Sequence, residues 1–212
     1  MESLGRHTDY GQDGLLEPDL AADPFDQFRS WLAVAEQAEI FEPNAFVLST
    51  QDPDGQLSSR TVLLKGITST SFQFVTNYRS RKGKALEAHS SVSMLFPWYS
   101  LKRQLIVYGQ AQRASAEVSD ALWNARPRGA QLASMASAQS QPVASREQLD
   151  ARLAELEAAH PEGVAVPRPE HWGAVEITPS SIEFWQGRSM RFHDRLRYER
   201  DGDGWRVVRL QP

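Results

Sequence analysis

The amino-acid sequence predicts a mainly β protein with additional helices (α+β), built on an antiparallel barrel. Many short β-branched and aromatic stretches are separated by turns of hairpin length, and the helical stretches cluster between them instead of alternating with them. The sequence also has no G-x-G-x-x-G motif, no P-loop and no internal repeat. Rossmann-type and P-loop nucleotide enzymes are therefore disfavoured.

The first element is expected after residues 1–22, a polar, acidic and aperiodic stretch that predicts a mobile N-terminal arm. Residues 23–212 are then expected to form one domain. Asp23 followed by Pro24 is typical of a helix start, because aspartate caps the first turn and proline fits the first helical position. This helix is expected to run to about Glu39, with its apolar residues on one face.

The strands are predicted from alternating apolar residues bounded by turn residues. The first two flank Asp52-Pro53-Asp54-Gly55, a typical hairpin turn. The strands are expected at Ala45–Gln51, Gln56–Lys65, Ser71–Thr76, Ser91–Trp98, Arg103–Arg113, Ala174–Thr178, Ser181–Trp185, Leu196–Glu199 and Trp205–Leu210. Helices are expected from Ser80 for a short distance, at Ser115–Ala125 and at Ser145–Ala159.

Charge is unevenly distributed along the 212 residues, although the formal net charge is only -4. Residues 60–104 carry eight basic side chains and a single acidic one, Glu87, whereas residues 1–59 are strongly acidic. A cationic segment inside an acidic protein indicates a local anionic ligand and argues against a nucleic-acid partner.

Composition excludes several other classes of site. The chain has no cysteine, which rules out disulfides, iron–sulfur clusters and thiolate metal sites. Its five histidines lack a metal-ligand spacing, so no metal site is predicted. No apolar run is long enough to span a membrane and the N-terminus lacks signal-peptide features, so we expect a cytoplasmic protein without a membrane partner.

Two basic stretches could each bind an anion. In Arg60-Thr-Val-Leu-Leu-Lys65 the two cations would lie on opposite faces of a strand unless a bulge intervenes. In Ser80-Arg81-Lys82-Gly83 the cations occupy the first turn of a helix, where positive charge is unfavourable unless an anion such as a phosphate is bound. The alternatives are an edge strand ended by solvated charges and a solvated basic loop.

Two further stretches carry arginines. Arg126-Pro127-Arg128 lies between two predicted helices, and Trp185-Gln186-Gly187-Arg188 is followed by Arg191-Phe-His193-Asp-Arg195. If the second segment is extended, Arg191 and Arg195 share a face with His193, which favours a second anion site with a hydrogen-bond donor. The alternative for an isolated histidine is a structural role.

Together these stretches resemble the pyridoxine/pyridoxamine 5'-phosphate oxidase family. The matching motifs occur in the family's order over nearly the whole chain, from about Asp23 to Pro212. They are Arg60-Thr-Val-Leu-Leu-Lys65, Ser80-Arg81-Lys82-Gly83, Phe96-Pro97-Trp98, Arg103-Gln104, Arg126-Pro127-Arg128, Phe184-Trp185-Gln186-Gly187 and Arg191-Phe-His193-Asp-Arg195.

The resemblance implies an FMN-binding split β-barrel that forms a homodimer, with FMN in clefts at the subunit interface. It implies oxidation of pyridoxine or pyridoxamine 5'-phosphate to pyridoxal 5'-phosphate, by hydride transfer to flavin N5, with O2 as acceptor and H2O2 as product. The flavin would supply the redox chemistry, which explains why no catalytic triad or carboxylate pair is found.

The resemblance also assigns roles to individual residues. The FMN phosphate would be bound by Arg60, Arg81 and Lys82. The rest of FMN would be contacted by Val62, Leu63, Leu64, Lys65, Val75, Thr76, Gln104, Gln139, Ser140, Trp185 and Arg195. Lys65 and Arg126 would bind the substrate phosphate, with Tyr10 closing over the substrate. Arg191 and His193 would be catalytic and lie over the pyridine ring.

The sequence departs from the family pattern at the substrate end. Leu122 and Ala130 replace a tyrosine and a serine that contact the substrate phosphate in the family. A more apolar pocket leaves open an alternative, a related flavin oxidase that acts on another planar substrate such as a reduced phenazine precursor. Those relatives typically lack the lysine that corresponds to Lys65. A further alternative is a barrel that binds flavin without turnover.

Overall fold

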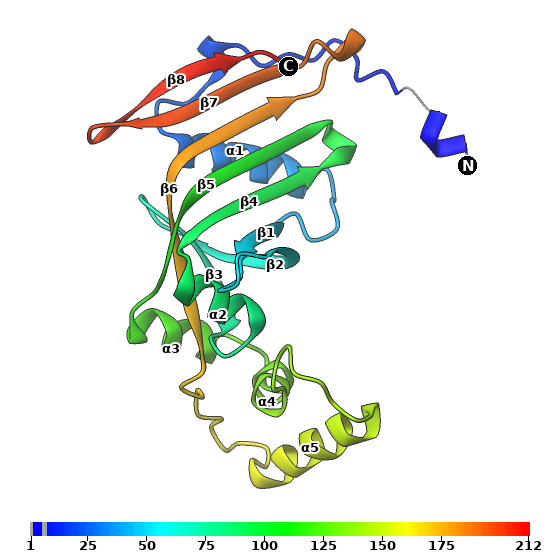
Figure 1. The fold of residues 1–212 in the computed structure, drawn as a ribbon, viewed down its shortest axis with the longest axis vertical. Coiled ribbons are helices and arrows are strands. Elements are labelled where there is room, and N and C mark those ends of the chain that lie inside the picture. The colour runs from blue at the N-terminus through cyan, green and yellow to red at the C-terminus, as the bar shows by residue number, and fades with distance from the viewer. Residues whose placement is uncertain (1, 6–7) are drawn as a thin grey trace.

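The computed structural model describes residues 2–5 and 8–212, and its sheet closes into a barrel. Every pairing between neighbouring strands is antiparallel, and β3 pairs with both β2 and β6, which closes the sheet β3-β2-β1-β4-β5-β6 on itself. The strands are β1 (Ala45–Gln51), β2 (Leu57–Ile67), β3 (Phe72–Asn77), β4 (Ser91–Trp98), β5 (Arg103–Arg113), β6 (Trp172–Gln186), β7 (Asp194–Asp201) and β8 (Gly204–Leu210). The predicted antiparallel α+β barrel is confirmed (Figure 1).

Strand β6 belongs to two parts of the sheet. Its first half, from Trp172 to Ile177, pairs with β3 and closes the barrel, whereas its second half pairs with β7. The prediction of two separate strands here was wrong. The extra residue, Ser180, forms a bulge opposite Tyr108 and Gly109 of β5, so the strand continues past Pro179. One continuous strand therefore runs from the barrel to the β7–β8 hairpin.

Each α-helix of the described residues except α4 begins just after a residue whose side chain caps its first turn. Asp23, Ser80, Ser115 and Ser145 each accept a hydrogen bond from a backbone N–H of the first turn, as four of the predicted starts require. Helix α4 begins after Pro127 without a side-chain cap, and it was not predicted from the sequence, where Arg126-Pro127-Arg128 was placed between two helices. The helices are α1 (Pro24–Gln37), α2 (Arg81–Ala88), α3 (Ala116–Asn124), α4 (Arg128–Ala136) and α5 (Arg146–Ala159).

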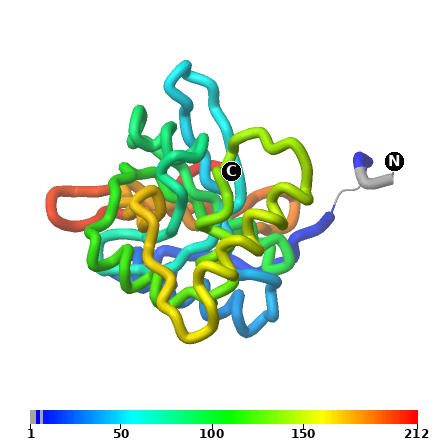
Figure 2. Tube along the Cα trace, turned by 90° about the horizontal axis from the view of Figure 1, so that it is seen from below, coloured from blue at the N-terminus to red at the C-terminus, as the bar shows by residue number. Residues whose placement is uncertain are grey.

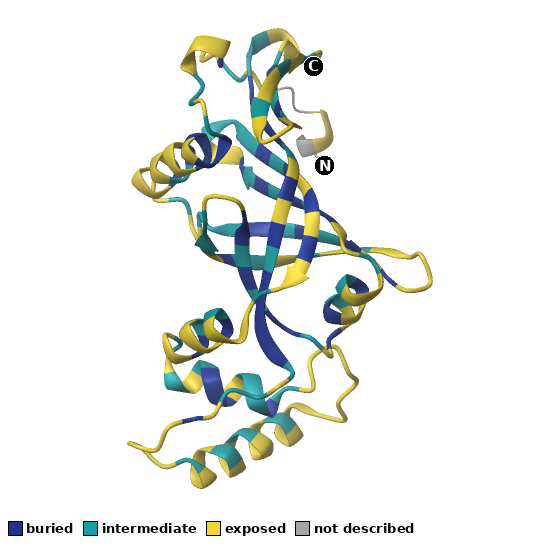
Figure 3. Ribbon diagram, turned by 90° about the vertical axis from the view of Figure 1, so that its left-hand side faces the viewer, coloured by how far each residue is buried: buried dark blue, intermediate teal, exposed yellow. Residues whose placement is uncertain are grey.

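Two clusters of buried apolar side chains hold the elements together. In the main core, Phe28 and Trp31 of α1 pack against Phe72, Phe96 and Trp98 of the barrel. The smaller core joins α3, α4 and the start of β6 through Trp123, Leu132, Val166 and Trp172. Figure 3 shows the buried residues running along the barrel and continuing into this lower group of helices. Helices α3 and α4 are thereby fixed beside the barrel.

Residues 10–21 of the N-terminal arm lie against the C-terminal strands. Leu15 is buried, and its N–H donates to Asp194 Oδ2 at 3.0 Å. Arg209 of β8 donates to the Leu15 carbonyl at 3.1 Å and forms an ion pair with Glu17 at 2.8 Å. The Tyr198 hydroxyl donates to the Ala21 carbonyl at 2.6 Å. Residues 1, 6 and 7 of the predicted mobile arm lie outside the described residues, and its mobility stays a prediction.

Several loops project from this body. Figure 2 shows the tip of the β1–β2 hairpin, in cyan, and the loop between α4 and α5, in yellow-green. In the part of the chain that the structure describes, no helix is both long and apolar enough to cross a bilayer.

Candidate active site

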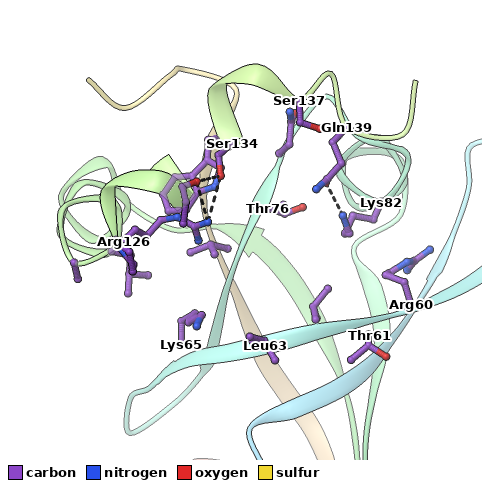
Figure 4. A pocket seen from close by; sticks show the side chains of 18 residues that line it. Arg60, Thr61, Leu63, Lys65, Thr76, Lys82, Arg126, Ser134, Ser137 and Gln139 are labelled. Carbon is purple, nitrogen blue, oxygen red and sulfur yellow. Dashed lines mark hydrogen bonds between the residues drawn. The ribbon is translucent and has the colours of Figure 1, made fainter. Parts of the chain in front are cut away.

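A cavity of about 690 Å³ lies where the edge of the barrel meets the lower helices. Its walls come from β2, β3, the first turn of α2, the end of α3, and α4 with the loop that follows it. Figure 4 shows positively charged side chains on two sides of this cavity, with Arg60 and Lys82 on one side and Arg126 and Lys65 on the other. Thr76 lies between the two sides.

The first cationic end is made by Arg60 and Lys82. The Arg60 guanidinium donates to the Leu48 carbonyl at 2.9 Å and to Thr50 Oγ1 at 2.8 Å, which fixes it at the end of the barrel. Lys82 Nζ donates to Gln139 Oε1 at 2.7 Å. Burial and, to a smaller extent, the nearby Arg60 charge lower the pKa of Lys82. Two partly desolvated cations side by side favour a bound anion.

The backbone around Gly83 determines where Lys82 points. Ser80 Oγ accepts from the Gly83 N–H at 3.2 Å, which caps α2. A Cβ at Gly83 would lie 2.2 Å from the Tyr78 carbonyl oxygen and 2.6 Å from that of Asn77. Glycine is therefore required for α2 to start this close to the end of β3. This close approach places Lys82 in the cavity wall.

Arg81 lies outside the cavity, although the sequence places it beside Lys82. Its Nε donates to Asp52 Oδ2 at 2.7 Å, and its Nη2 donates to Gln56 Oε1 at 2.8 Å. Both partners belong to the β1–β2 turn, and Asp52 is buried. Arg81 is thus held by the β1–β2 turn and does not line the cavity.

The middle of the cavity has an unpaired polar atom. Thr76 is only 4% exposed, and its Oγ1 has no hydrogen-bond partner among the described residues. A buried hydroxyl without a partner is costly, and a ligand in the cavity would supply one. Val62, Leu63 and Val75 provide apolar wall on either side. This combination suits a planar ring with polar edges.

The second cationic end is made by Lys65 and Arg126. Lys65 is the extra residue of a bulge in β2, where the pairing with β3 shifts between Leu64 and Gly66. Arg126 lies over the Trp172 ring, 5.2 Å from its centroid, and its Nη2 donates to Ser134 Oγ at 3.2 Å. Its Nε is buried without a partner among the described residues, and burial lowers its pKa. This arginine is also placed to bind an anion.

The aromatic and histidine residues predicted near the C-terminus form a separate group. Tyr10 of the arm packs edge-on against Trp185 and His193, with ring centroids 5.9 and 5.3 Å apart. A Cβ at Gly187 would lie 2.5 Å from Tyr10 Cδ1, so this glycine makes room for the arm. Gln104 pairs with Trp185 across the neighbouring strands β5 and β6.

The loop that carries His193 is not extended, so the condition under which Arg191 and His193 would share one face of a strand is not met. Residues Ser189–Arg191 form a 3-10 turn in which Met190 and Arg191 have φ of 55° and 59°. Within this loop the Arg188 N–H donates to His193 Nδ1 at 3.0 Å. Burial and then the Arg191 charge lower the pKa of His193. The ring is therefore neutral near pH 7, with its hydrogen on Nε2.

Arg195 is fixed by an ion pair. Its Nε donates at 2.7 Å to Oε1 of Glu183, a buried residue, and it lies on β7 directly opposite Trp185.

The structure therefore divides the residues predicted from the sequence into two sets. The cavity is lined by Arg60, Val62, Leu63, Lys65, Val75, Thr76, Lys82, Arg126 and Gln139. The cavity lining does not include Tyr10, Leu64, Arg81, Gln104, Ser140, Trp185, Arg191, His193 and Arg195. Among the lining residues that sequence reasoning missed are Ser134 and Ser137, because it did not predict α4.

Strand β6 keeps the cavity and the aromatic group of Tyr10, Trp185 and His193 apart within one chain. Trp172 lines the cavity, and Trp185 belongs to the aromatic group at the other end of the same strand. At about 3.3 Å per residue, these two positions are roughly 40 Å apart. A single small ligand cannot reach both in one chain.

Two solved structures share the whole fold. PhzG from Burkholderia lata, in complex with tetrahydrophenazine-1-carboxylic acid, matches with a TM-score of 0.88 and 37% identity over 95% of this chain and 100% of that chain. A pyridoxamine 5'-phosphate oxidase-related, FMN binding protein from Nostoc punctiforme matches with a TM-score of 0.74 over 91% of this chain and 100% of that chain. At 14% identity, the second structure shows the fold alone.

Sequence relatives extend the comparison. A family model described as pyridoxamine 5'-phosphate oxidase matches residues 33–160, and one described as the pyridoxine 5'-phosphate oxidase C-terminal dimerisation region matches residues 172–212. The pyridoxine/pyridoxamine 5'-phosphate oxidase of Rubrobacter xylanophilus is 52% identical over 98% of this chain and 95% of its own. The enzyme of the same name from Streptomyces avermitilis is 50% identical over 96% and 93%.

The barrel and the matching relatives together define an oxidoreductase of the split-barrel class. The matches over nearly the full length of the chain place it within this class. The chain belongs to the pyridoxine/pyridoxamine 5'-phosphate oxidase family.

Proposed function

We propose that the protein is an FMN-dependent oxidase that converts pyridoxine or pyridoxamine 5'-phosphate to pyridoxal 5'-phosphate, with O2 as acceptor and H2O2 as product. The observation that carries this proposal is the cavity with two cationic ends, Arg60 with Lys82 and Lys65 with Arg126. Two ligands that each bear a phosphate, a flavin and its substrate, would use both ends.

The residues of the first end fit FMN. Arg60 and Lys82 would bind its phosphate, because both cations are partly desolvated and close to each other. Thr76 Oγ1 would find in the ring or ribityl chain the hydrogen-bond partner that the protein does not provide. Gln139 holds Lys82 in place. When bound, FMN would accept a hydride from the substrate carbon that bears the alcohol or amine and pass the electrons to O2. The alcohol would also lose its hydroxyl proton to give the aldehyde, whereas the imine formed from the amine would be hydrolysed by water with release of ammonia.

Lys65 and Arg126 would bind the substrate phosphate at the other end. The Arg126 guanidinium lies over the Trp172 ring, and its Nη2 donates a hydrogen bond to Ser134. Its Nε has no hydrogen-bond partner among the described residues. Arginine binds phosphate through several N–H groups at once, so a guanidinium with an unpaired N–H suits this ligand. The substrate ring would then extend toward the flavin along the apolar wall.

A second copy of the chain would supply the remaining residues. Within one chain the aromatic group is roughly 40 Å from the cavity along β6. A two-fold symmetric homodimer brings the same patch of each copy to the other, so both cavities would be completed in the same way. The residues expected from the partner are Tyr10, Gln104, Trp185, Arg191, His193 and Arg195. FMN would then lie at the subunit interface.

In that arrangement Arg191 and His193 would act on the substrate. The neutral His193 would donate from Nε2, because its Nδ1 already accepts from the Arg188 N–H. Arg191 would supply positive charge beside the pyridine ring, and Tyr10 would cover the ring from the arm. These groups would orient the substrate and exclude water.

A second candidate function is oxidation of a reduced tricyclic acid. PhzG was solved with tetrahydrophenazine-1-carboxylic acid and shares 37% identity with this chain. Leu122 and Ala130 line the cavity near Arg126 and make that end more apolar than a phosphate site built with hydroxyls. A larger apolar substrate would pack against both side chains.

One experiment separates these functions. The purified protein is examined for a flavin spectrum and then assayed for peroxide with pyridoxine 5'-phosphate, pyridoxamine 5'-phosphate and a dihydrophenazine carboxylic acid. We expect a yellow protein that turns over the phosphorylated vitamers. Turnover of the tricycle alone would favour the second function, and a flavin-bound protein inactive with all three would indicate a binding role. A protein unable to take up FMN would contradict both oxidase functions.

A further inference from the structure

The substrate end of the cavity contains a hydroxyl that the family resemblance does not assign. Leu122 and Ala130 both line this end and neither can donate a hydrogen bond. Ser134 follows Ala130 by four residues in α4, which is about one helical turn, so both lie on the same face of the helix. Ser134 also lines the cavity, and Figure 4 shows it on the side of Arg126.

The hydrogen bonds of Ser134 leave it able to bind an anion. Its Oγ donates to the Ala130 carbonyl at 2.8 Å and accepts from Arg126 Nη2 at 3.2 Å. The hydroxyl hydrogen is thus bonded to the Ala130 carbonyl inside α4, a group whose regular partner in a helix is a backbone N–H. A rotation about the Cα–Cβ or C–O bond would redirect this hydrogen into the cavity at little cost. The half-buried position of Ser134 limits competition from water.

Arg126 has an N–H group at this end of the cavity that is unpaired among the described residues. Its Nε is buried and unpaired within the described residues, while its Nη2 contacts Ser134 and, at 3.4 Å, the Ala130 carbonyl. Because Arg126 Nη2 already contacts Ser134 Oγ, an oxygen-rich dianion held by the Arg126 guanidinium would also meet the Ser134 hydroxyl. Lys65 supplies a further positive charge to the same end.

We propose that Ser134 binds the phosphate of the substrate together with Arg126 and Lys65, in place of the hydroxyl missing at position 130. This inference rests on the proposed function and makes it more specific. Ser134 is then a residue that selects phosphorylated over unphosphorylated substrates. The departure at Ala130 is compensated one helical turn further along α4.

The test compares binding with and without a phosphate. Dissociation constants are measured by absorbance titration for pyridoxal 5'-phosphate and for pyridoxal, with the FMN-loaded full-length protein. The variants are Ser134→Ala, Ser134→Thr, and Ser134→Ala combined with Ala130→Ser. Alanine is a strong helix former, so α4 is expected to tolerate the first change. Ser90→Ala serves as the matched control, because it removes an exposed hydroxyl bonded to Gln110 on another part of the chain.

We expect Ser134→Ala to weaken pyridoxal 5'-phosphate binding about tenfold, as loss of a hydrogen bond to a charged group does, and to change pyridoxal binding less than about twofold. Threonine at position 134 and serine at position 130 should each restore most of the affinity. The KM for the phosphorylated vitamer should rise by the same factor, with kcat nearly unchanged. The Ser90→Ala protein should match wild type.

Two results would overturn the proposal. Equal weakening for both ligands would show that Ser134 only supports the cavity, and an unchanged affinity for pyridoxal 5'-phosphate would show that it does not touch the phosphate. Both are distinct from failure of the proposed function, in which the wild-type protein itself neither binds pyridoxal 5'-phosphate nor oxidises the phosphorylated vitamers.

Discussion

Replacing Gly83 by alanine tests whether the close approach of α2 to β3 positions Lys82. The added Cβ would lie 2.2 Å from the Tyr78 carbonyl oxygen, 2.5 Å from its carbonyl carbon and 2.6 Å from the Asn77 carbonyl oxygen. All three are main-chain atoms at the end of β3, so no change of side-chain rotamer relieves the overlap. The first turn of α2 must move, and Lys82 must move with it.

The size of the effect follows from two opposing contributions. Overpacking a well-filled site costs about 1–3 kcal/mol, and contact with rigid backbone favours the upper part of that range. Alanine has a helix propensity about 1 kcal/mol better than glycine, which offsets part of the cost. We therefore expect Gly83→Ala to lower the free energy of unfolding by about 2 kcal/mol, or the melting temperature by about 4–8 °C for a chain of this size. FMN should bind about tenfold more weakly, because Lys82 no longer points into the cavity.

Gly129→Ala is the matched control, because Gly129 also lies in the first turn of a helix but has no atom within 4 Å of its added Cβ. It should leave FMN binding unchanged and stabilise the protein by about 0.5–1 kcal/mol. Thermal melts at fixed protein concentration and FMN titrations measure both quantities. If Gly83→Ala behaves like Gly129→Ala, the steric account of Lys82 is refuted.

Three further outcomes follow from the site. Arg191→Ala should lower turnover much more than FMN retention, measured by peroxide assay and flavin absorbance, and equal losses would show that Arg191 binds the cofactor. Leu122→Tyr should lower the KM for pyridoxamine 5'-phosphate severalfold by restoring a hydroxyl beside Arg126; an unchanged KM would remove this explanation. Burial and the Arg191 charge lower the pKa of His193, so the folded protein protonates this ring only at a pH below the usual pKa of about 6.5. The unfolded chain binds the proton more readily, so His193 lowers the free energy of unfolding as the pH decreases through that region. An NMR titration that places the His193 pKa at or above 6.5 would contradict this sign.

Local patterns were sufficient to predict most of the barrel. The observed ranges of β1, β4 and β5 equal the predicted ones, because alternating side chains and turn residues determine both ends of these strands. The continuity of β6 depends on two different partners, β3 and β7, and on the bulge at Ser180. Neither is visible in the residues of β6 alone.

Local sequence patterns also predicted only part of the site, because the rest depends on contacts between distant residues. Arg60, Lys65, Lys82 and Arg126 were singled out from the sequence, and the cavity brings them together. Arg81 does not line the cavity because it bonds to Asp52, which is 29 residues away in the chain. The contact of Ser134 with Arg126 depends on α4, whose start lacks a capping side chain and was not predicted.

The length of β6 has a consequence for inheritance. If each site combines the cavity of one chain with the far end of β6 from another, a defect at Lys82 and a defect at Arg191 damage different halves of a site. Two alleles, each inactive alone, would then complement one another in a mixed dimer. One of its sites would carry both defects and the other neither, so random assortment would leave about one quarter of all sites intact.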